Sequence, residues 1–138
     1  MSTGLNLTLP PGGVLVGLGA DLIEVERVRG VLERQGPRFL ARVFTEEEQA
    51  YCSGMAHPYK HYAARFAAKE AVSKAFGTGI GAALGWQDIE VCRRKTGAPF
   101  VVLHGRGRDL FAARGARQLH LSLTHTENYA AATAILEG

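Results

Sequence analysis

Three short stretches of this sequence place polar side chains of chemically useful types among apolar neighbours. The first holds a carboxylate, the second a carboxylate and an amine four residues apart, and the third two hydroxyls and an imidazole. The residues concerned are Asp21, Glu70, Lys74, Ser122, Thr124 and His125. Carboxylates from separate segments suit a Mg2+ ion whose remaining ligands are phosphate oxygens and waters. This set therefore predicts phosphate-centred chemistry.

Each of these residues also has a purely structural interpretation. Asp21 could cap a following helix, Glu70 and Lys74 could form a surface ion pair, and His125 could be a turn residue. Their joint occurrence favours chemistry instead. Lys74 would then meet phosphate charge, and the glycine loop at 77–79 would let backbone N–H groups approach the same phosphate.

Other common nucleotide and zinc motifs do not fit this sequence. Gly17-Leu18-Gly19 follows an apolar run, but the third glycine of a dinucleotide-binding fingerprint would fall at Leu22. No Gly-Lys-Ser/Thr sequence of a P-loop occurs. His57 and His61 have i, i+4 spacing, yet Pro58 between them disfavours one continuous helix and no third zinc ligand is near.

The first half of the chain supplies a strand and several helices to position these groups. An apolar run at 14–23 predicts a buried strand that ends near Asp21, and residues 24–36 have helical spacing with a Gly-Pro stop. Residues 37–52 are predicted to be helical in two pieces. The second piece starts at Thr45, an N-cap followed by three glutamates that favour the helix dipole.

The second half begins with a long helix and ends in strands. The helix is predicted from about Tyr59 and carries Glu70 and Lys74. Beyond it we expect two strands of a hairpin, a short helix and two further strands, at 86–94, 100–105, 106–116, 120–125 and 129–136. This order predicts an α+β fold, a single domain over 14–138 with an antiparallel sheet and one long helix. Residues 1–13 are polar and rich in Pro and Gly, which predicts a flexible extension.

The charge of the chain indicates anionic partners. The 138 residues have a formal net charge of +3, and twelve of the sixteen basic residues are Arg, whose planar fork suits phosphate and carboxylate. A nucleic-acid-binding module is the alternative from another class, because Arg93-Arg94-Lys95 is a basic run. Aromatic residues do not interleave with the basic ones as stacking platforms would, so we expect no nucleic-acid partner.

The cysteine content and hydropathy indicate a cytoplasmic protein. Cys52 and Cys92 are forty positions apart, which encodes neither a disulfide framework nor a zinc cage. No run reaches the roughly 18 apolar residues of a membrane span, and the first residues lack the pattern of a signal peptide. We therefore expect no membrane partner.

Three blocks of sequence, in this order and spacing, resemble the signature blocks of the holo-[acyl-carrier-protein] synthases, the short type of 4'-phosphopantetheinyl transferase. They are GLGADLIEVERV at 17–28, RFAAKEAVSKAFGTGI at 65–80 and HLSLTHTENYAAA at 120–132, and the middle block is the most specific. The resemblance extends from about Val14 to Leu136. It implies the fold of that family and Mg2+-dependent transfer of 4'-phosphopantetheine from coenzyme A to a serine of apo-acyl carrier protein. The products would be holo-acyl carrier protein, for fatty acid biosynthesis, and adenosine 3',5'-bisphosphate.

The resemblance also implies roles for individual residues. Asp21 and Glu70 would be the magnesium ligands and, with Lys74, the catalytic residues. The residues implied to lie around coenzyme A are Lys74, Gly77, Thr78, Gly79, Thr124 and His125, with Ser122 beside them. Arg27 and Arg34 would face the acidic carrier protein. The acceptor of the serine proton stays open between a metal-bound water and Glu70.

The resemblance finally implies association. Longer relatives are similar to two fused copies with the site between them, whereas the short type resembles a homotrimer with sites at subunit interfaces. The chain departs from the family pattern in residues 1–13 and in Gly97-Ala98-Pro99, which lacks a lysine often found between the Gly and the Pro. The second departure puts one peripheral phosphate contact in doubt. A coenzyme A binder that keeps the fold without catalysis is the remaining alternative.

Overall fold

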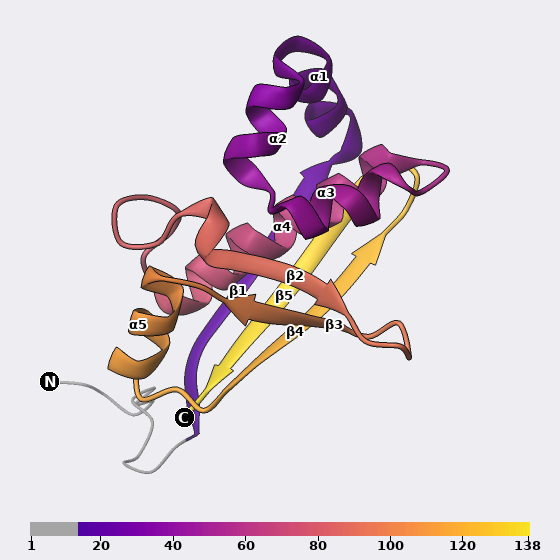
Figure 1. The fold of residues 1–138 in the computed structure, drawn as a ribbon. Coiled ribbons are helices and arrows are strands. Elements are labelled where there is room, and N and C mark those ends of the chain that lie inside the picture. Colours follow the sequence, from indigo (N-terminus) through magenta and orange to yellow (C-terminus); the bar gives the residue numbers. More distant parts are fainter. Residues whose placement is uncertain (1–13) are drawn as a thin grey trace, which may run out of the picture.

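The computed structural model describes residues 14–138, so the predicted extension at 1–13 lies outside the described residues. Figure 1 shows the order of the elements along the chain. They are β1 (Leu15–Glu24), α1 (Val25–Gln35), α2 (Pro37–Val43), α3 (Glu46–Ser53), α4 (Pro58–Phe76), the 3-10 turn η1 (Trp86–Asp88), β2 (Ile89–Arg93), β3 (Pro99–Leu103), α5 (Arg106–Ala113), β4 (Gln118–His125) and β5 (Tyr129–Glu137). The predicted α+β fold is confirmed.

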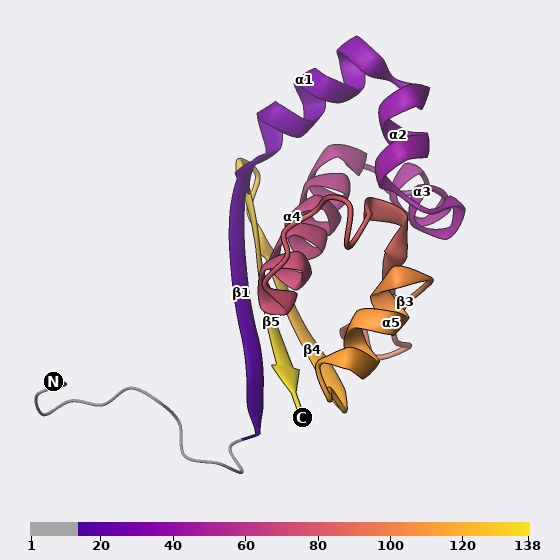
Figure 2. The same ribbon diagram turned by 90° about the vertical axis from the view of Figure 1, so that its left-hand side faces the viewer.

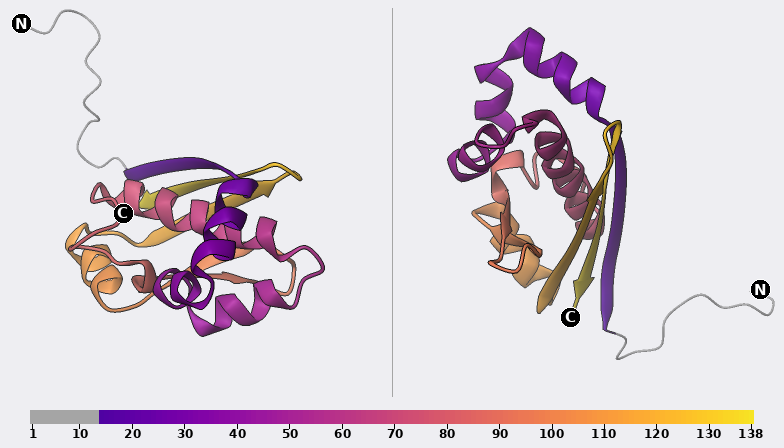
Figure 3. Two further views of the ribbon diagram at one scale, coloured as in Figure 1. Left: turned by 90° about the horizontal axis from the view of Figure 1, so that it is seen from above. Right: turned by 90° about the vertical axis from the view of Figure 1, so that its right-hand side faces the viewer.

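The strands form two antiparallel sheets. One has three strands in the order β1-β5-β4, and the other is the β2–β3 hairpin. Helix α4 lies against one face of the three-stranded sheet, and Figure 2 shows it between that sheet and the part of the chain that contains β3 and α5. Figure 3 shows α1 and α2 beyond the end of the sheet where β1 finishes. Helix α4 is therefore the central element of the domain.

Small residues let α4 and β1 approach each other closely. Helix α4 is buried on several sides at once through its alanines, as expected of a helix in the middle of a core. On β1, a Cβ atom added to Gly17 would lie 1.8 Å from the carbonyl oxygen of Ala75, and one added to Gly19 would lie 1.9 Å from that of Ala71. Only glycine fits at these two positions, so the backbone of β1 runs directly against α4.

A buried ion pair fixes α4 to α3 and to the hairpin. Lys69 Nζ lies 2.7 Å from Glu48 Oε1, with both side chains fully buried, and donates hydrogen bonds to the carbonyl oxygens of Trp86 and Ile89 at 2.9 and 2.6 Å. Glu48 also completes a capping box with Thr45 at the start of α3. The predicted N-cap at Thr45 is confirmed, and its helix is connected to the helix that carries Glu70.

Two boundaries differ from the sequence prediction. Strand β1 continues through Asp21 to Glu24, because Asp21 pairs with Ala132 of β5 within the ladder. Glu24, not Asp21, stands at the N-cap of α1, so the capping interpretation of Asp21 is wrong. The stretch from Trp86 begins as a 3-10 turn and becomes a strand only at Ile89.

The outer face of the three-stranded sheet carries exposed apolar side chains. Residues of β1 alternate between the α4 side and the outside, and Leu18 and Leu22 point outward with 59% and 67% exposure. Tyr129 and Ile135 of β5 lie on the same face, and Ile135 is opposite Leu18 in the register. Among residues 14–138 no helix is long and apolar enough to cross a membrane. The outer face of the sheet thus leaves several large apolar side chains exposed in one chain.

Candidate active site

The close contact between β1 and α4 brings Asp21 and Lys74 together. The two residues are 53 positions apart in sequence, and Lys74 Nζ lies 3.1 Å from Asp21 Oδ1. The same ammonium donates to the carbonyl oxygen of Ala20 at 2.9 Å. Lys74 is half-exposed, whereas Asp21 is mostly buried, so the pair lies where the sheet meets solvent.

Glu70, one turn before Lys74 on α4, is the second carboxylate of this site. Burial raises the pKa of the Glu70 carboxyl above its ordinary value, and the negative charge of Asp21 raises it further, while Lys74 acts in the opposite direction. The structural interpretation of Glu70 and Lys74 as an ion pair is wrong, because Lys74 pairs with Asp21. Two neighbouring carboxylates that repel each other are a favourable place for a cation.

The donor set fits a magnesium ion. Mg2+ prefers oxygen ligands and takes one or two protein carboxylates, with waters and phosphate oxygens completing its octahedron. Residues 14–138 contain no group of three or more His, Cys, Asp or Glu that could hold a metal by themselves. A cation held by Asp21 and Glu70 would therefore depend on substrate oxygens for the rest of its coordination shell.

An apolar pocket adjoins the two carboxylates. It has a volume of about 200 Å3. Its lining consists of Asp21, Glu70, Arg27 and the apolar residues Leu22, Ile23, Val28, Val31, Phe39 and Phe66. Arg27 is exposed in the first half of α1, and Arg34 is exposed in its last turn. Neither forms an ion pair within the described residues, so both guanidinium groups remain available to an acidic partner.

The glycine loop is turned toward α4 and not outward. Gly77 ends the helix in the left-handed region at φ 80°, and its N–H donates to the carbonyl oxygen of Lys74 at 2.9 Å. The N–H groups of Thr78 and Gly79 both donate to the carbonyl oxygen of Ser73 at 3.2 Å. These three N–H groups thus satisfy carbonyl groups at the end of the helix, and contact of the glycine loop with a phosphate stays a prediction. No atom outside the chain neighbours lies within 4 Å of a Cβ built on Gly77 or Gly79, so a ligand can approach them closely.

His125 lies at the opposite end of α4. Its ring is 5.3 Å from that of His61, which belongs to the first turn of the helix. Lys74 follows His61 by thirteen residues, or about 20 Å along the helix axis. Thr124 and Ser122 alternate with His125 and point to the outer face of the sheet. One chain thus does not bring its predicted coenzyme A residues together; it separates them into two groups.

Two arginines near His125 were not among the predicted site residues. The guanidinium carbons of Arg65 and Arg93 lie 4.2 and 5.7 Å from the centre of the Tyr51 ring. Arg65 is 1% exposed, and the Nε atoms of both arginines are buried without a hydrogen-bond partner among the described residues. Burial and the charges of these arginines lower the pKa of His125. Because both side chains are positively charged and have an Nε–H group without a partner, they predict a bound anion at this end of α4.

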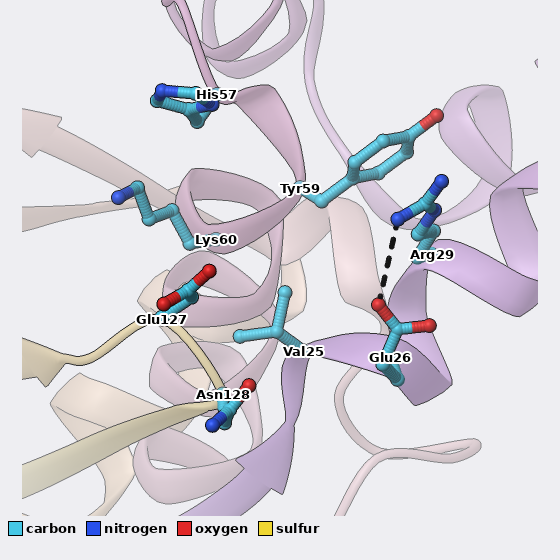
Figure 4. A pocket seen from close by; sticks show the side chains of 8 residues that line it. All are labelled: Val25, Glu26, Arg29, His57, Tyr59, Lys60, Glu127 and Asn128. Carbon is cyan, nitrogen blue, oxygen red and sulfur yellow. Dashed lines mark ion pairs between the residues drawn. The ribbon is translucent and has the colours of Figure 1, made fainter.

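A second hollow, lined in part by the first turn of α4, is separate from the carboxylates. It has a volume of about 410 Å3 and lies beside the turn between β4 and β5, as Figure 4 shows. Lys60 and His57 lie on one side of it, and the ion pair between Glu26 and Arg29, 3.6 Å long, lies on another. Its charges are mixed, and neither Asp21 nor Glu70 lines it. The smaller pocket beside the carboxylates is therefore the better candidate for the reaction.

Comparison with known proteins agrees with the predicted family and fold. The family model described as the 4'-phosphopantetheinyl transferase superfamily matches residues 17–134. A holo-[acyl-carrier-protein] synthase of Koribacter versatilis is 44% identical over 124 residues, which is 90% of this chain and 99% of that protein. That of Moorella thermoacetica is 49% identical over 119 residues, or 86% of this chain and 91% of that protein.

Two solved structures with similar folds are also holo-[acyl-carrier-protein] synthases. The crystal structure of the holo-[acyl-carrier-protein] synthase from Neisseria meningitidis has a TM-score of 0.84 and 28% identity, and the match covers 90% of this chain and 99% of that one. A holo-(acyl-carrier-protein) synthase from Bacillus anthracis in complex with CoA (3',5'-ADP) has a TM-score of 0.77 and 35% identity, covering 91% and 98%. The class defined by fold and site is thus a transferase of phosphate-linked groups. The chain belongs to the 4'-phosphopantetheinyl transferase superfamily, which confirms the resemblance of its three sequence blocks.

Proposed function

We propose that this protein transfers 4'-phosphopantetheine from coenzyme A to a serine of apo-acyl carrier protein, giving holo-acyl carrier protein and adenosine 3',5'-bisphosphate. The observation that supports this most strongly is that Asp21 and Glu70 line one pocket while Lys74 pairs with Asp21, within a family match over residues 17–134. The test is the mass of carrier protein after incubation with the protein, coenzyme A and Mg2+. Unchanged mass would leave the non-catalytic coenzyme A binder as the better description.

The proposed reaction is an attack of the carrier serine oxygen on the phosphorus next to the pantetheine arm. The new bond joins that oxygen to phosphorus, and the bond from phosphorus to the leaving 3',5'-bisphosphate breaks. Such transfers need positioning and neutralisation of phosphate charge more than covalent participation by the protein. A magnesium ion bound by Asp21 and Glu70 would supply most of that neutralisation.

Lys74 and Glu70 contribute to the reaction through charge and proton transfer. Lys74 is oriented by Asp21 and by the carbonyl of Ala20, so its ammonium stands at the position where phosphate oxygens would approach the carboxylates. The raised pKa of Glu70 makes this carboxylate a better proton acceptor than an ordinary surface glutamate. The acceptor of the serine proton stays open between Glu70 and a metal-bound water.

We propose that three copies associate through the outer face of the three-stranded sheet. Exposed apolar side chains on this face, among them Leu18, Leu22 and Ile135, support burial against another copy. The separation of His125 from Lys74 within one chain supports a site shared between copies. A second copy would bring the group around Arg65 and His125 to the group around Lys74 and the glycine loop, so that both contact one coenzyme A.

The carrier protein is proposed to dock on α1 beside the pocket. Arg27 lines the pocket that contains the two carboxylates, and Arg34 extends the same helix by two turns. Both are exposed and form no ion pair within the described residues, which suits an acidic partner. The cytoplasmic location also stays a prediction, based on the cysteine content.

Nucleic-acid binding is a weaker second candidate. Its support is the excess of arginine and the basic run at 93–95, and Arg94 of that run lies 4.7 Å from the centre of the Phe100 ring within its own hairpin. Replacement of Asp21 by Ala separates the two functions. Loss of an acid would preserve or strengthen binding to nucleic acid but would abolish metal-dependent transfer.

A further inference from the structure

The loop between α4 and η1 is held by two arginines, Arg106 at the start of α5 and Arg114 at the C-cap of that helix. At its start, Arg114 donates from Nε and Nη2 to the carbonyl oxygen of Phe76, at 3.2 and 2.9 Å. Further along, Arg106 donates from Nη1 to the carbonyl oxygen of Ala82 and from Nε to Asp88 Oδ2 at 3.1 Å. Both ends of the loop at 77–85 are therefore bound to the same short helix.

Asp88 carries the second contact back to the loop itself. Its Oδ2 accepts the N–H of Gly85 at 2.8 Å as well as the hydrogen bond from Arg106. A Cβ built on Gly85 would lie 2.5 Å from Arg106 Nη2, so a side chain at this position would displace the guanidinium. Glycine at position 85 therefore leaves the space that the Arg106 guanidinium occupies.

Three glycines leave open space along this loop. Nothing lies within 4 Å of a Cβ built on Gly77, Gly79 or Gly81. Glycine also loses more conformational freedom on ordering than any other residue. Ile80 and Leu84 pack against the core, whereas the backbone around the glycines depends on hydrogen bonds for its order.

The two arginines are spaced to reach both ends at once. Positions 106 and 114 are eight residues apart, which puts them on one side of the helix at a separation of about 12 Å. Arg114 also places a cation at the C-terminal end of α4, where the helix dipole favours positive charge. Lys74 belongs to the last turn of α4, so this end of the helix is part of the proposed site.

We propose that Arg106 and Arg114 are positioning residues that keep the loop at 77–85 and the last turn of α4 in the conformation that accepts the phosphates of coenzyme A. This inference rests on the proposed function. If the hydrogen bonds of Arg106 and Arg114 are removed, binding of coenzyme A must itself order the loop. The free energy needed for this ordering lowers the affinity for coenzyme A. Once coenzyme A is bound, the reacting groups are unchanged, so the rate at saturation is preserved.

The test compares Arg106→Met and Arg114→Met with the unchanged protein. We expect the KM for coenzyme A to rise about 3- to 10-fold in each variant, with kcat and the KM for carrier protein within about 2-fold. Arg108→Met is the matched control on the same helix, because Arg108 forms no ion pair or side-chain hydrogen bond within the described residues. Arg114→Lys should recover part of the affinity, since one amine can still donate to the carbonyl of Phe76.

Hydrogen exchange without coenzyme A gives a readout independent of catalysis. In the free protein the N–H of Gly81 is bonded to Leu84 and that of Gly85 to Asp88. Both should exchange faster in Arg106→Met, while the N–H of Val91, bonded to Glu48, should exchange as before. Faster exchange at Val91 would show that the Arg106→Met variant is unfolding as a whole. In that case the Arg114→Lys variant is used in place of Arg106→Met to test the role of the arginines.

Three results would overturn the inference. They are unchanged KM and exchange in both methionine variants, an equal change in the Arg108→Met control, and a loss confined to kcat. If the unchanged protein fails to transfer the group at all, the proposed function fails. The exchange measurement then still decides whether the two arginines order the loop.

Discussion

Lys74 donates its hydrogen bond to Asp21, with 3.1 Å between Nζ and Oδ1, and forms no ion pair with Glu70 on the same helix. Without a bound cation, the ammonium thus neutralises one of the two carboxylates. Burial and the charge of Asp21 raise the pKa of Glu70, so its ionised form is disfavoured. The proposed divalent cation next to Glu70 would favour that ionised form.

Replacement of Glu70 by Gln tests the metal site. The variant keeps size and helix propensity but loses an anionic ligand, so folding should persist while transfer falls by on the order of 100-fold or more. Partial recovery by excess Mg2+ is expected, because a weakened ligand set still binds metal at higher concentration. Transfer is measured by the mass of carrier protein, and near-normal turnover at low millimolar Mg2+ would refute the assignment.

Replacement of Arg27 by Glu tests carrier-protein docking. The substitution sets like charges against an acidic partner, so use of carrier protein should weaken far more than binding of coenzyme A. The loss should shrink as salt rises, because the side chain is exposed. Steady-state kinetics with each substrate varied in turn measures both effects. Equal damage to coenzyme A affinity would place Arg27 in the nucleotide site instead.

Replacement of Leu18 by Glu tests the proposed trimer. Leu18 is 59% exposed in one chain, so a charge there should cost little in a single copy but should prevent burial of the outer sheet face. We expect sedimentation equilibrium to give a trimer for the unchanged protein and smaller species for the variant, with transfer lost together with assembly. Ala41→Glu is the control, since Ala41 is exposed and belongs to α2, a helix that lies beyond the end of the sheet in Figure 3. An active monomer of 14.8 kDa would contradict the proposal.

Replacement of Arg65 by Met separates stability from binding. Arg65 is almost fully buried and has no carboxylate partner within the described residues, and a buried unpaired charge destabilises a folded protein. The variant should therefore melt at the same or a higher temperature while its affinity for coenzyme A falls by about 10-fold or more. Calorimetry measures both quantities. A large drop in Tm with unchanged affinity would make Arg65 a structural residue only.

The stability of the protein should fall as pH falls between 6.5 and about 4. Burial, then the charges of His125 and Arg65, lower the pKa of His61 from 6.5 to about 4. In that range the unfolded chain binds a proton that the folded protein excludes, so acid favours unfolding. In His61→Gln, the free energy of unfolding should fall less between these pH values. Urea titrations that show the same pH dependence in both proteins would contradict this.

Local sequence signals predicted the local structures well. Thr45 caps α3 as expected because an N-cap depends only on the residues beside it. Asp21 was expected to end a strand, but pairing with β5 and the contact with Lys74 keep β1 regular through it. The loop N–H groups were expected to face a phosphate, but closing the end of α4 uses them. Tertiary contacts override local preference at these positions.

The missed part of the site depends on long-range packing. Arg65 and Arg93 are brought together by Tyr51, a residue of α3 that neither one neighbours in sequence. The available signal was an arginine inside an apolar, alanine-rich helix, where a charged side chain needs a reason to be buried. The sequence alone predicted that Glu70 and Lys74 are neighbours on one helix face. It could not predict that Lys74 pairs with Asp21, which is distant in the sequence.

Phosphopantetheine transfer is measured by incubating apo-acyl carrier protein with this protein, coenzyme A and Mg2+ and recording the mass of the carrier. We expect a mass increase of one phosphopantetheine group on the carrier serine. We also expect equimolar release of adenosine 3',5'-bisphosphate, with both signals lost when Mg2+ is chelated or Asp21 is replaced by Ala. A carrier of unchanged mass, or full transfer by the Asp21→Ala variant, would contradict the proposed function.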